Sequence, residues 1–261
     1  MAEIPEKAIN PVSLEEIAAE TGLFNAQRRI PEFLVMGMLP QVLAAENRAE
    51  KLRVLLDRAV TGGILAVAGL RNPQAFLRLL HVLAGSVGRD VTMESLGRAA
   101  GVSRHTAESY LALLEEAGLV TVCRPWADSL PTEVRGTRKI WFRDLGIRNA
   151  VLNDFTHAGA RKDLAGLWQN FFFMERVKWN AAHGTGRELH FWRLMRPSTA
   201  HIDFIETGPG GMRLFACRED GARMPKLPAL FEKAYGPGRL EIVDRRSVVR
   251  FITGNGGMTE T

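Results

Sequence analysis

The chain has 261 residues, 46% hydrophobic and 24% charged, which is the composition of a globular protein long enough for two domains with separate cores. The formal net charge of +5 allows a nucleic-acid partner without requiring one, and the isolated Cys123 and Cys217 offer neither a disulfide framework nor metal-binding spacing, as expected in a reducing cytoplasm. The first residues form no apolar leader and no run of about 18 apolar residues occurs, so we expect a cytoplasmic protein that contacts no membrane.

The sequence pattern of residues 1–72 predicts helices almost throughout. Ser13, with Glu three residues later, has the pattern of a capping box, which starts the first helix. Two more helices are expected at 26–36 and 47–60, where apolar residues recur at helical spacing. The pair Gly62-Gly63 is expected to be a break or a flexible joint after the third helix. We therefore treat 1–72 as a helical segment that precedes the first recognisable domain.

Residues 73–155 predict a winged helix-turn-helix domain. After a first helix that begins at Pro73, a short helix at 94–100 is followed by the turn Gly101-Val102-Ser103 and a second helix that runs to about residue 117. Glycine suits the left-handed position that ends a helix, and serine is a good N-cap for the next one. Two apolar runs, at 119–123 and 139–142, are expected to be the two strands of the wing.

The second helix of a helix-turn-helix can enter the major groove of DNA, so its outward residues are candidates for nucleic-acid binding. The candidates are Ser103, Arg104, His105, Thr106 and Ser109 on the helix, and Arg135, Arg138 and Lys139 on the wing. Carboxylates on the same helix would repel the phosphates of a nucleic acid. Winged helices also serve as structural or protein-contacting modules, and the sequence leaves both alternatives open.

Residues 156–253 predict a small α/β domain that follows a boundary loop at 156–161. The expected elements, in order, are a long helix at 163–180, strands at 188–193, 201–206 and 213–217, a helix at 228–234, and strands at 240–243 and 248–252. The tail at 254–261 is expected to be disordered. Together with the first half, this order predicts the mixed α/β (α+β) fold class.

An ordered set of short runs carries a family resemblance. The runs are Gly37-Met38-Leu39-Pro40, Gly101-Val102-Ser103-Arg104-His105-Thr106, Gly146-Ile147-Arg148-Asn149-Ala150, Leu167-Trp168-Gln169-Asn170-Phe171, Phe191-Trp192-Arg193 and Ile202-Asp203-Phe204. In this order they resemble the C-terminal region of bacterial and archaeal AAA-type P-loop ATPases, which implies a winged helix joined to a restriction-endonuclease-like domain of unknown function. The ATPase module is missing, because no GxxxxGK[ST] occurs, so we expect no nucleotide cofactor.

The resemblance also implies where a nuclease site would lie. Active members of the endonuclease-like fold hold Mg²⁺ with an Asp at a strand end, an E-x-K on the next strand and a Glu from a preceding helix. Glu175 and Asp203 stand at matching positions, and Glu206 or Glu219 are the remaining substitutes. No E-x-K stands near residues 216–220, where Arg218 would oppose a metal ion and instead favours an ion pair. Regular alternation would place Asp203 and Glu206 on opposite faces of their strand.

We therefore expect no catalytic residue, no metal and no cofactor in this chain. The leading interpretation is a non-catalytic nucleic-acid-binding or interaction module, with duplex DNA as the candidate partner. One alternative is a divergent Mg²⁺-dependent nuclease that uses Glu175, Asp203 and either Glu206 or Glu219. Another is a structural docking module for a separate ATPase subunit, or for a second copy of the chain. Metal-dependent cleavage and salt-dependent DNA binding distinguish the three.

Overall fold

The computed structural model describes residues 9–218 and 225–253, and it confirms the mixed α+β class, with many helices and two small sheets. The described residues divide into two compact units. Of the described residues, the first unit comprises 9–12, Arg29–Val122 and Lys139–Asn170, and the second comprises Ser13–Arg28, Cys123–Arg138, 171–218 and 225–253. The expected disordered tail, at 254–261, lies outside the described residues. Of the described helices, none combines the length and apolar character that crossing a bilayer requires.

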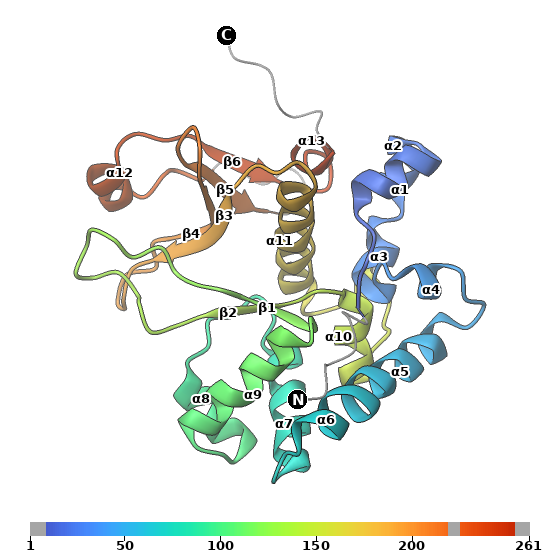
Figure 1. Ribbon diagram of the computed structural model, residues 1–261. Helices are drawn as coiled ribbons and strands as arrows, with labels where there is room; N and C mark the ends of the chain where they lie inside the picture. The colour runs from blue at the N-terminus through green and yellow to red at the C-terminus, as the bar shows by residue number, and fades with distance from the viewer. Residues whose placement is uncertain (1–8, 219–224, 254–261) are drawn as a thin grey trace. The chain divides into compact units, whose positions relative to one another are not determined.

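The first unit is mainly helical and contains most of a two-stranded sheet (Figure 1). Its elements are α3 (Ile30–Met36), α4 (Pro40–Leu43), α5 (Arg48–Ala59), η1 (Val60–Leu65), α6 (Ala66–Ala68), α7 (Pro73–Gly85), α8 (Met93–Ala100), α9 (Arg104–Glu116), β1 (Val120–Cys123), β2 (Lys139–Phe142), α10 (Leu145–Leu152), η2 (Ala158–Ala160) and the start of α11 (Leu164–Ala182). Asn47 and Asn72 cap α5 and α7 by accepting hydrogen bonds from backbone N–H groups three residues later.

Two expectations for the N-terminal helices are wrong. The helix expected at 26–36 is divided into α2 (Leu23–Arg28) and α3, because Pro31 stands in the first turn of α3, where its missing N–H is tolerated. The pair Gly62-Gly63 does not break the chain, which continues from α5 as the π-helix η1 and then α6. Burial of Val60 and Ile64 stabilises this turn, and it outweighs a glycine penalty of about 1 kcal/mol per residue.

The elements α8 and α9 form a helix-turn-helix with a close approach at the turn. Gly101 ends α8 in the left-handed conformation, at φ 70° and ψ 38°. The N–H of Val102 donates to the carbonyl of Gly97 at 2.8 Å, and Ser103 caps α9 by accepting from the N–H of Thr106. A Cβ at Gly97 would lie 2.8 Å from the Val102 carbonyl oxygen, so only glycine allows this contact. The turn therefore fixes the direction in which α9 leaves α8.

Buried polar side chains join α10 to the end of α3. Asp144 caps α10 by accepting from the Ile147 N–H, and its second oxygen accepts from the Met38 N–H at 2.7 Å. The side-chain amide of Asn149 donates to the carbonyls of Leu34 and Val35, at 3.0 and 2.8 Å. These bonds satisfy carbonyl groups that the last turn of α3 leaves without an intrahelical partner.

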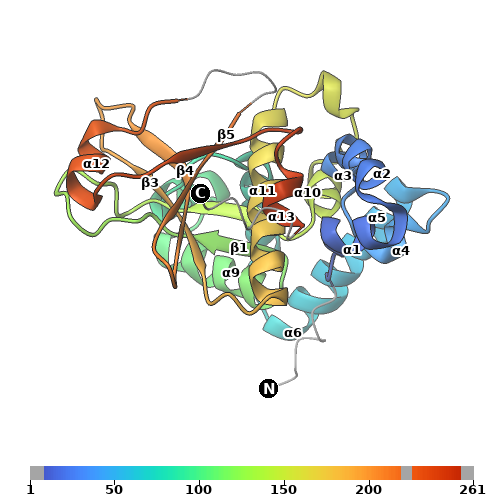
Figure 2. The same cartoon turned by 90° about the horizontal axis from the view of Figure 1, so that it is seen from above.

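The second unit is a four-stranded sheet with helices on both faces (Figures 1 and 2). It contains α1 (Leu14–Thr21), α2, the greater part of α11, β3 (Glu188–Arg193), β4 (His201–Thr207), β5 (Arg213–Cys217), α12 (Ala229–Tyr235), β6 (Leu240–Val243) and α13 (Val249–Ile252). The strand order is β3-β4-β5-β6; the first two pairs are antiparallel and the last is parallel. Phe172 of α11 packs against Phe215 and Phe251, whereas Phe231 of α12 packs against Trp192 on the other face.

The strand expected at 248–252 is instead the short helix α13. Its β-branched residues favour a strand, but a turn at Asp244 directs the backbone into helical bonds. Asp244 accepts from the N–H groups of Arg246 and Ser247, and the N–H of Val248 then donates to the Asp244 carbonyl. Local hydrogen bonds from an Asp at a turn have overridden the propensity of the residues that follow.

A β-bulge interrupts β4 at the candidate site. Trp192 pairs with Ile202 and His190 with Ile205, so β4 has one residue more than β3 between these pairs. Ile202 and Ile205, which regular alternation would place on opposite faces, belong to the same buried cluster on the α12 side of the sheet. The alternation argument for Asp203 and Glu206 therefore does not hold, because a bulge changes the face to which residues point.

The segment between β1 and β2 covers the outer edge of β3, within the second unit. The N–H of Trp126 donates to the Phe191 carbonyl at 2.7 Å, and the N–H of Val134 donates to the Arg193 carbonyl at 3.1 Å. Glu133, only 2% exposed, accepts from the Trp192 indole at 2.6 Å and from the Tyr235 hydroxyl. The segment thus protects an edge strand from pairing with another chain.

Candidate functional site

The outward face of α9 presents some of the side chains expected to bind nucleic acid. Ser103, Arg104, His105 and Ser109 are exposed, and Thr106 is half-buried. The three hydroxyl groups already have bonds within the helix-turn-helix. The Ser103 hydroxyl bonds the N–H and the hydroxyl of Thr106, and the Ser109 hydroxyl donates to the His105 carbonyl. Arg104 and His105 therefore remain the most suitable groups for an external partner.

Arg104 forms two ion pairs at the surface of the helix-turn-helix. Its Nη1 lies 2.7 Å from a carboxylate oxygen of Glu94, at the start of α8, and its Nε lies 3.1 Å from Glu108 on α9. The hydrogen bond with Glu108, followed by the charge of Glu94, raises the pKa of Arg104. The side chain is nevertheless 62% exposed. A phosphate could reach it, but only in competition with two carboxylates.

The three wing candidates differ in their exposure. Arg135 is exposed and Arg138 half-buried, and both lie in the segment that belongs to the second unit. Lys139 is only 7% exposed, and its ammonium lies 5.8 Å from the centre of the Trp141 ring. The proposed nucleic-acid contact of Lys139 therefore does not fit the structure. Its place in the wing predicts an exposed lysine, whereas β2 is buried along its whole length.

The carboxylate of Glu175 is bound to groups of its own. It is 2% exposed, one oxygen accepts from the Leu14 N–H at 2.7 Å, and the other pairs with Lys178 one turn further along α11. Glu175 therefore helps to anchor the start of α1 to α11. This is a structural use of the carboxylate, because backbone and ammonium donors occupy both of its oxygens.

Asp203 forms the ion pair that the sequence indicated. Its Oδ2 accepts from the Cys217 N–H at 2.9 Å and from Nη1 of Arg218 at 2.7 Å. The imidazole Nε2 of His201 lies 3.7 Å from Oδ1. The aspartate side chain is 4% exposed, whereas that of Arg218 is 27% exposed. The cation at this end of β5 is thus a guanidinium that the protein itself supplies.

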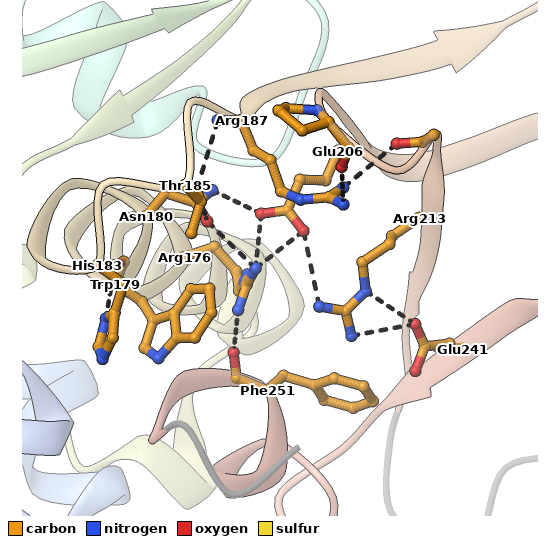
Figure 3. A network of polar contacts seen from close by, with 12 residues as sticks. Arg176, Trp179, Asn180, His183, Thr185, Arg187, Glu206, Arg213, Glu241 and Phe251 are labelled. Carbon is orange, nitrogen blue, oxygen red and sulfur yellow. Dashed lines mark hydrogen bonds and ion pairs between the residues drawn. The ribbon is translucent and has the colours of Figure 1, made fainter. Parts of the chain in front are cut away.

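Glu206 is the centre of a separate buried network (Figure 3). Arg176 Nη2 donates to both carboxylate oxygens, at 2.6 and 2.8 Å, and the Asn180 amide donates to one of them. Arg213 lies 3.9 Å from the same carboxylate and 3.3 Å from Glu241. Arg176 also donates to the Phe251 carbonyl at the end of α13. The network joins α11, β4, β5, β6 and α13.

Burial determines the electrostatics of this network. Arg176 is 1% and Glu206 0% exposed. Burial lowers the pKa of Arg176, and the charge and hydrogen bonds of Glu206 oppose that shift. The two opposite charges therefore compensate each other in the interior, where water is excluded. A buried pair of this kind has a structural role. Removing one partner strongly destabilises the fold, because the other charge is then buried without compensation.

The candidate carboxylates do not converge. Each of Glu175, Asp203 and Glu206 has its own set of donors, and Glu219 lies outside the described residues. In residues 9–218 and 225–253, no group of three or more His, Cys, Asp or Glu side chains is placed to hold a metal ion. The donor set around Asp203, a backbone N–H and a guanidinium, also does not fit Mg²⁺, which requires oxygen ligands in octahedral geometry.

Sequence reasoning missed the structural roles of two carboxylates, Glu206 and Glu133. Arg176 and Asn180 stand one helical turn apart on α11, a spacing that could have indicated a shared acceptor such as Glu206. Glu133 stands in an irregular loop, and nothing in the local pattern indicates that Ser129, Leu130, Trp192 and Tyr235 all donate to it. Burial alone would raise the pKa of Glu133, but the hydrogen bonds, led by that from Tyr235, lower it overall.

Comparison with known families gives one match. Residues 27–158 match the family model described as a domain of unknown function (DUF8612), and this region contains the whole helix-turn-helix. Neither the curated proteins nor the solved structures give a significant match to the chain.

Proposed function

The chain belongs to the family of the domain of unknown function DUF8612, and on this premise we propose that it is a non-catalytic binding module whose helix-turn-helix contacts duplex nucleic acid. The observation that carries the proposal is the outward face of α9. Its first turn is exposed, capped by Ser103 and held against α8 by the contact between Gly97 and Val102. A helix presented in this way has the shape that enters a major groove.

The charges on this surface favour weak binding with little sequence preference. Arg104 would exchange its carboxylate partners for a phosphate, and the nearby Glu115 and Glu116 are exposed. Binding to a phosphate backbone is dominated by counterion release, so its affinity falls steeply as salt rises. The strongest base contacts are bidentate, and Arg104, the one arginine of α9, is already paired with Glu94 and Glu108. We therefore propose that the protein contacts the phosphate backbone of the nucleic acid and does not recognise its base sequence.

Replacing Arg104 and Arg138 together by Ala should weaken duplex binding and reduce its salt dependence. Each lost phosphate contact lowers the slope of log affinity against log salt by roughly 0.9, so the double variant should lose about one to two units. The measurement is fluorescence anisotropy of a labelled duplex, from low to moderate salt. The matched control is the double variant Arg71→Ala with Arg239→Ala, which removes two exposed arginines elsewhere and should bind like the wild type.

The second candidate, a docking module for a protein partner, is favoured by one observation. The ion pairs of Arg104 with Glu94 and Glu108 already neutralise the cation that a nucleic acid would need. A separately encoded ATPase subunit is the partner that the family resemblance suggests. If the wild type binds no duplex even at low salt, or if the double variant binds it unchanged, the docking function replaces the nucleic-acid function.

A further inference from the structure

Strand register brings several basic residues to one end of the four-stranded sheet. β3 ends where β4 begins, since Arg193 pairs with His201. The parallel strands β5 and β6 end together, since Cys217 pairs with Val243. Because β4 and β5 are antiparallel, the start of β4 and the end of β5 lie at the same end. We call this the basic end of the sheet; its basic residues are Arg193, Arg196, His201, Arg218, Arg245 and Arg246.

Among the described residues at this end, the acidic side chains are fewer and already bound. Asp203 accepts from the Cys217 N–H and from Arg218. Asp244 accepts from the N–H groups of Arg246 and Ser247, which lowers its pKa against the opposing effect of burial. Arg196, His201, Arg245 and Arg246 are exposed. The described part of this surface is therefore positively charged and suits an anionic partner.

Arg218 is held in place through one nitrogen of its guanidinium. Its Nη1 donates to Asp203 at 2.7 Å and to the Cys217 carbonyl at 2.6 Å. No acceptor among the described residues bonds its Nε or Nη2, and the side chain is 27% exposed. A guanidinium fixed through one nitrogen leaves a planar pair of N–H groups, which can donate hydrogen bonds to two oxygens of one phosphate. Fixing the side chain in advance also reduces the entropy lost on binding.

We propose that the basic end of the sheet binds the phosphodiester backbone of nucleic acid, with Arg218 as its bidentate contact and without a metal ion. The proposal rests on the proposed function only for the class of partner, because the contact surface is a different one. Arg218 provides a permanent cation beside Asp203, where a metal-dependent site would require oxygen ligands. His201, 52% exposed and close to the same carboxylate, borders the site. No bond is made or broken, so the contact holds a nucleic acid and does not cleave it.

The test compares three single variants of the full chain. Arg218→Lys retains the charge beside Asp203, so the fold is preserved, but it removes the bidentate fork. Arg246→Ala removes an exposed charge at the basic end, and Arg239→Ala removes an exposed arginine before β6, at the opposite end of the sheet. A labelled oligonucleotide duplex is the probe, read by anisotropy across salt concentrations. Circular dichroism of each variant confirms that the fold is unchanged.

Arg218→Lys should lower the affinity for the duplex by roughly three- to ten-fold, because lysine cannot replace a bidentate guanidinium. Arg246→Ala should reduce the salt slope by about 0.9, and Arg239→Ala should leave both quantities unchanged. If Arg218→Lys and Arg246→Ala both bind like Arg239→Ala, the inference is overturned. If binding then still depends on Arg104 and Arg138, the helix-turn-helix function stands alone.

The opposite pattern of binding among the variants would favour the basic end over the helix-turn-helix. Loss of binding in the Arg218 and Arg246 variants, with none in the Arg104 and Arg138 variant, would retain the basic end and remove the helix-turn-helix function.

A titration with inorganic phosphate and one with polyglutamate complete the test. Saturable phosphate binding that requires Arg218, without any oligonucleotide binding, would assign a free-phosphate site and overturn the inference. Polyglutamate binding as tight as that of the duplex would also overturn it.

Discussion

Replacing Arg176 by Met is expected to lower the free energy of unfolding by about 3 to 5 kcal/mol, the usual cost of leaving a buried charge without its partner. The variant keeps the length of the side chain but leaves Glu206, which is fully buried, with the Asn180 amide and the more distant Arg213 as its partners among the described residues. It also removes the bond that holds the Phe251 carbonyl at the end of α13. Urea denaturation followed by circular dichroism measures the loss.

Two further variants identify the origin of this loss. The double variant Arg176→Met with Glu206→Met removes both charges, so it should be clearly more stable than Arg176→Met alone, because an apolar pair can replace a buried ion pair at little cost. Arg104→Met breaks the exposed pairs with Glu94 and Glu108 and should cost far less stability than Arg176→Met, because solvent screens exposed ion pairs. A double variant as unstable as Arg176→Met would show that the uncompensated charge is not the cause.

Replacing Gly37 by Ala is expected to cost about 3 to 5 kcal/mol, from backbone strain together with the loss of a helix cap. Gly37 has φ 70° and ψ −167°, a conformation that is essentially restricted to glycine. A Cβ there would lie 2.1 Å from an oxygen of Asp144, which would have to move away. Asp144 would then lose its bonds to the N–H groups of Met38 and Ile147. Thermal and urea unfolding measure the effect.

Gly69→Ala is the matched control for that substitution. Gly69 also has a positive φ, 54°, but its ψ of 39° is the left-handed helical conformation, and no atom lies within 4 Å of an added Cβ. The variant should therefore cost only the conformational penalty, about 1 kcal/mol. An equal loss of stability in the two variants would contradict the role assigned to Asp144, because it would leave backbone conformation as the only cause.

Much of the secondary structure follows from local patterns. The caps at Ser13 and Ser103, and the strands at 188–193, 213–217 and 240–243, agree with the structure to the residue. Local sequence could not show that η1 continues through two glycines or that α13 follows the turn at Asp244, because packing and turn hydrogen bonds decide both. It also could not show that the segment between β1 and β2 pairs with β3, which is distant in the sequence.

The candidate site was less accessible to sequence reasoning than the fold. The ion pair of Asp203 with a guanidinium was predicted, because Arg218 stands at the end of the neighbouring strand. The bulge in β4 was not, since a one-residue irregularity leaves no periodic signal; it removes the regular alternation on which the argument about Asp203 and Glu206 rested. The burial of Lys139 depends on how β2 packs, which the residue type alone does not indicate.

The central claim, that the charged groups of the second unit bind and stabilise but do not catalyse, is tested most directly by a plasmid-nicking assay. Wild type, Asp203→Asn and Glu175→Gln are incubated with supercoiled plasmid and Mg²⁺ or Mn²⁺, with a metal-chelator control. Because Asp203 pairs with Arg218 and Glu175 with Lys178, we predict no metal-dependent nicking above background in any of the three. Nicking by the wild type that requires the metal and is lost in both variants would contradict the account.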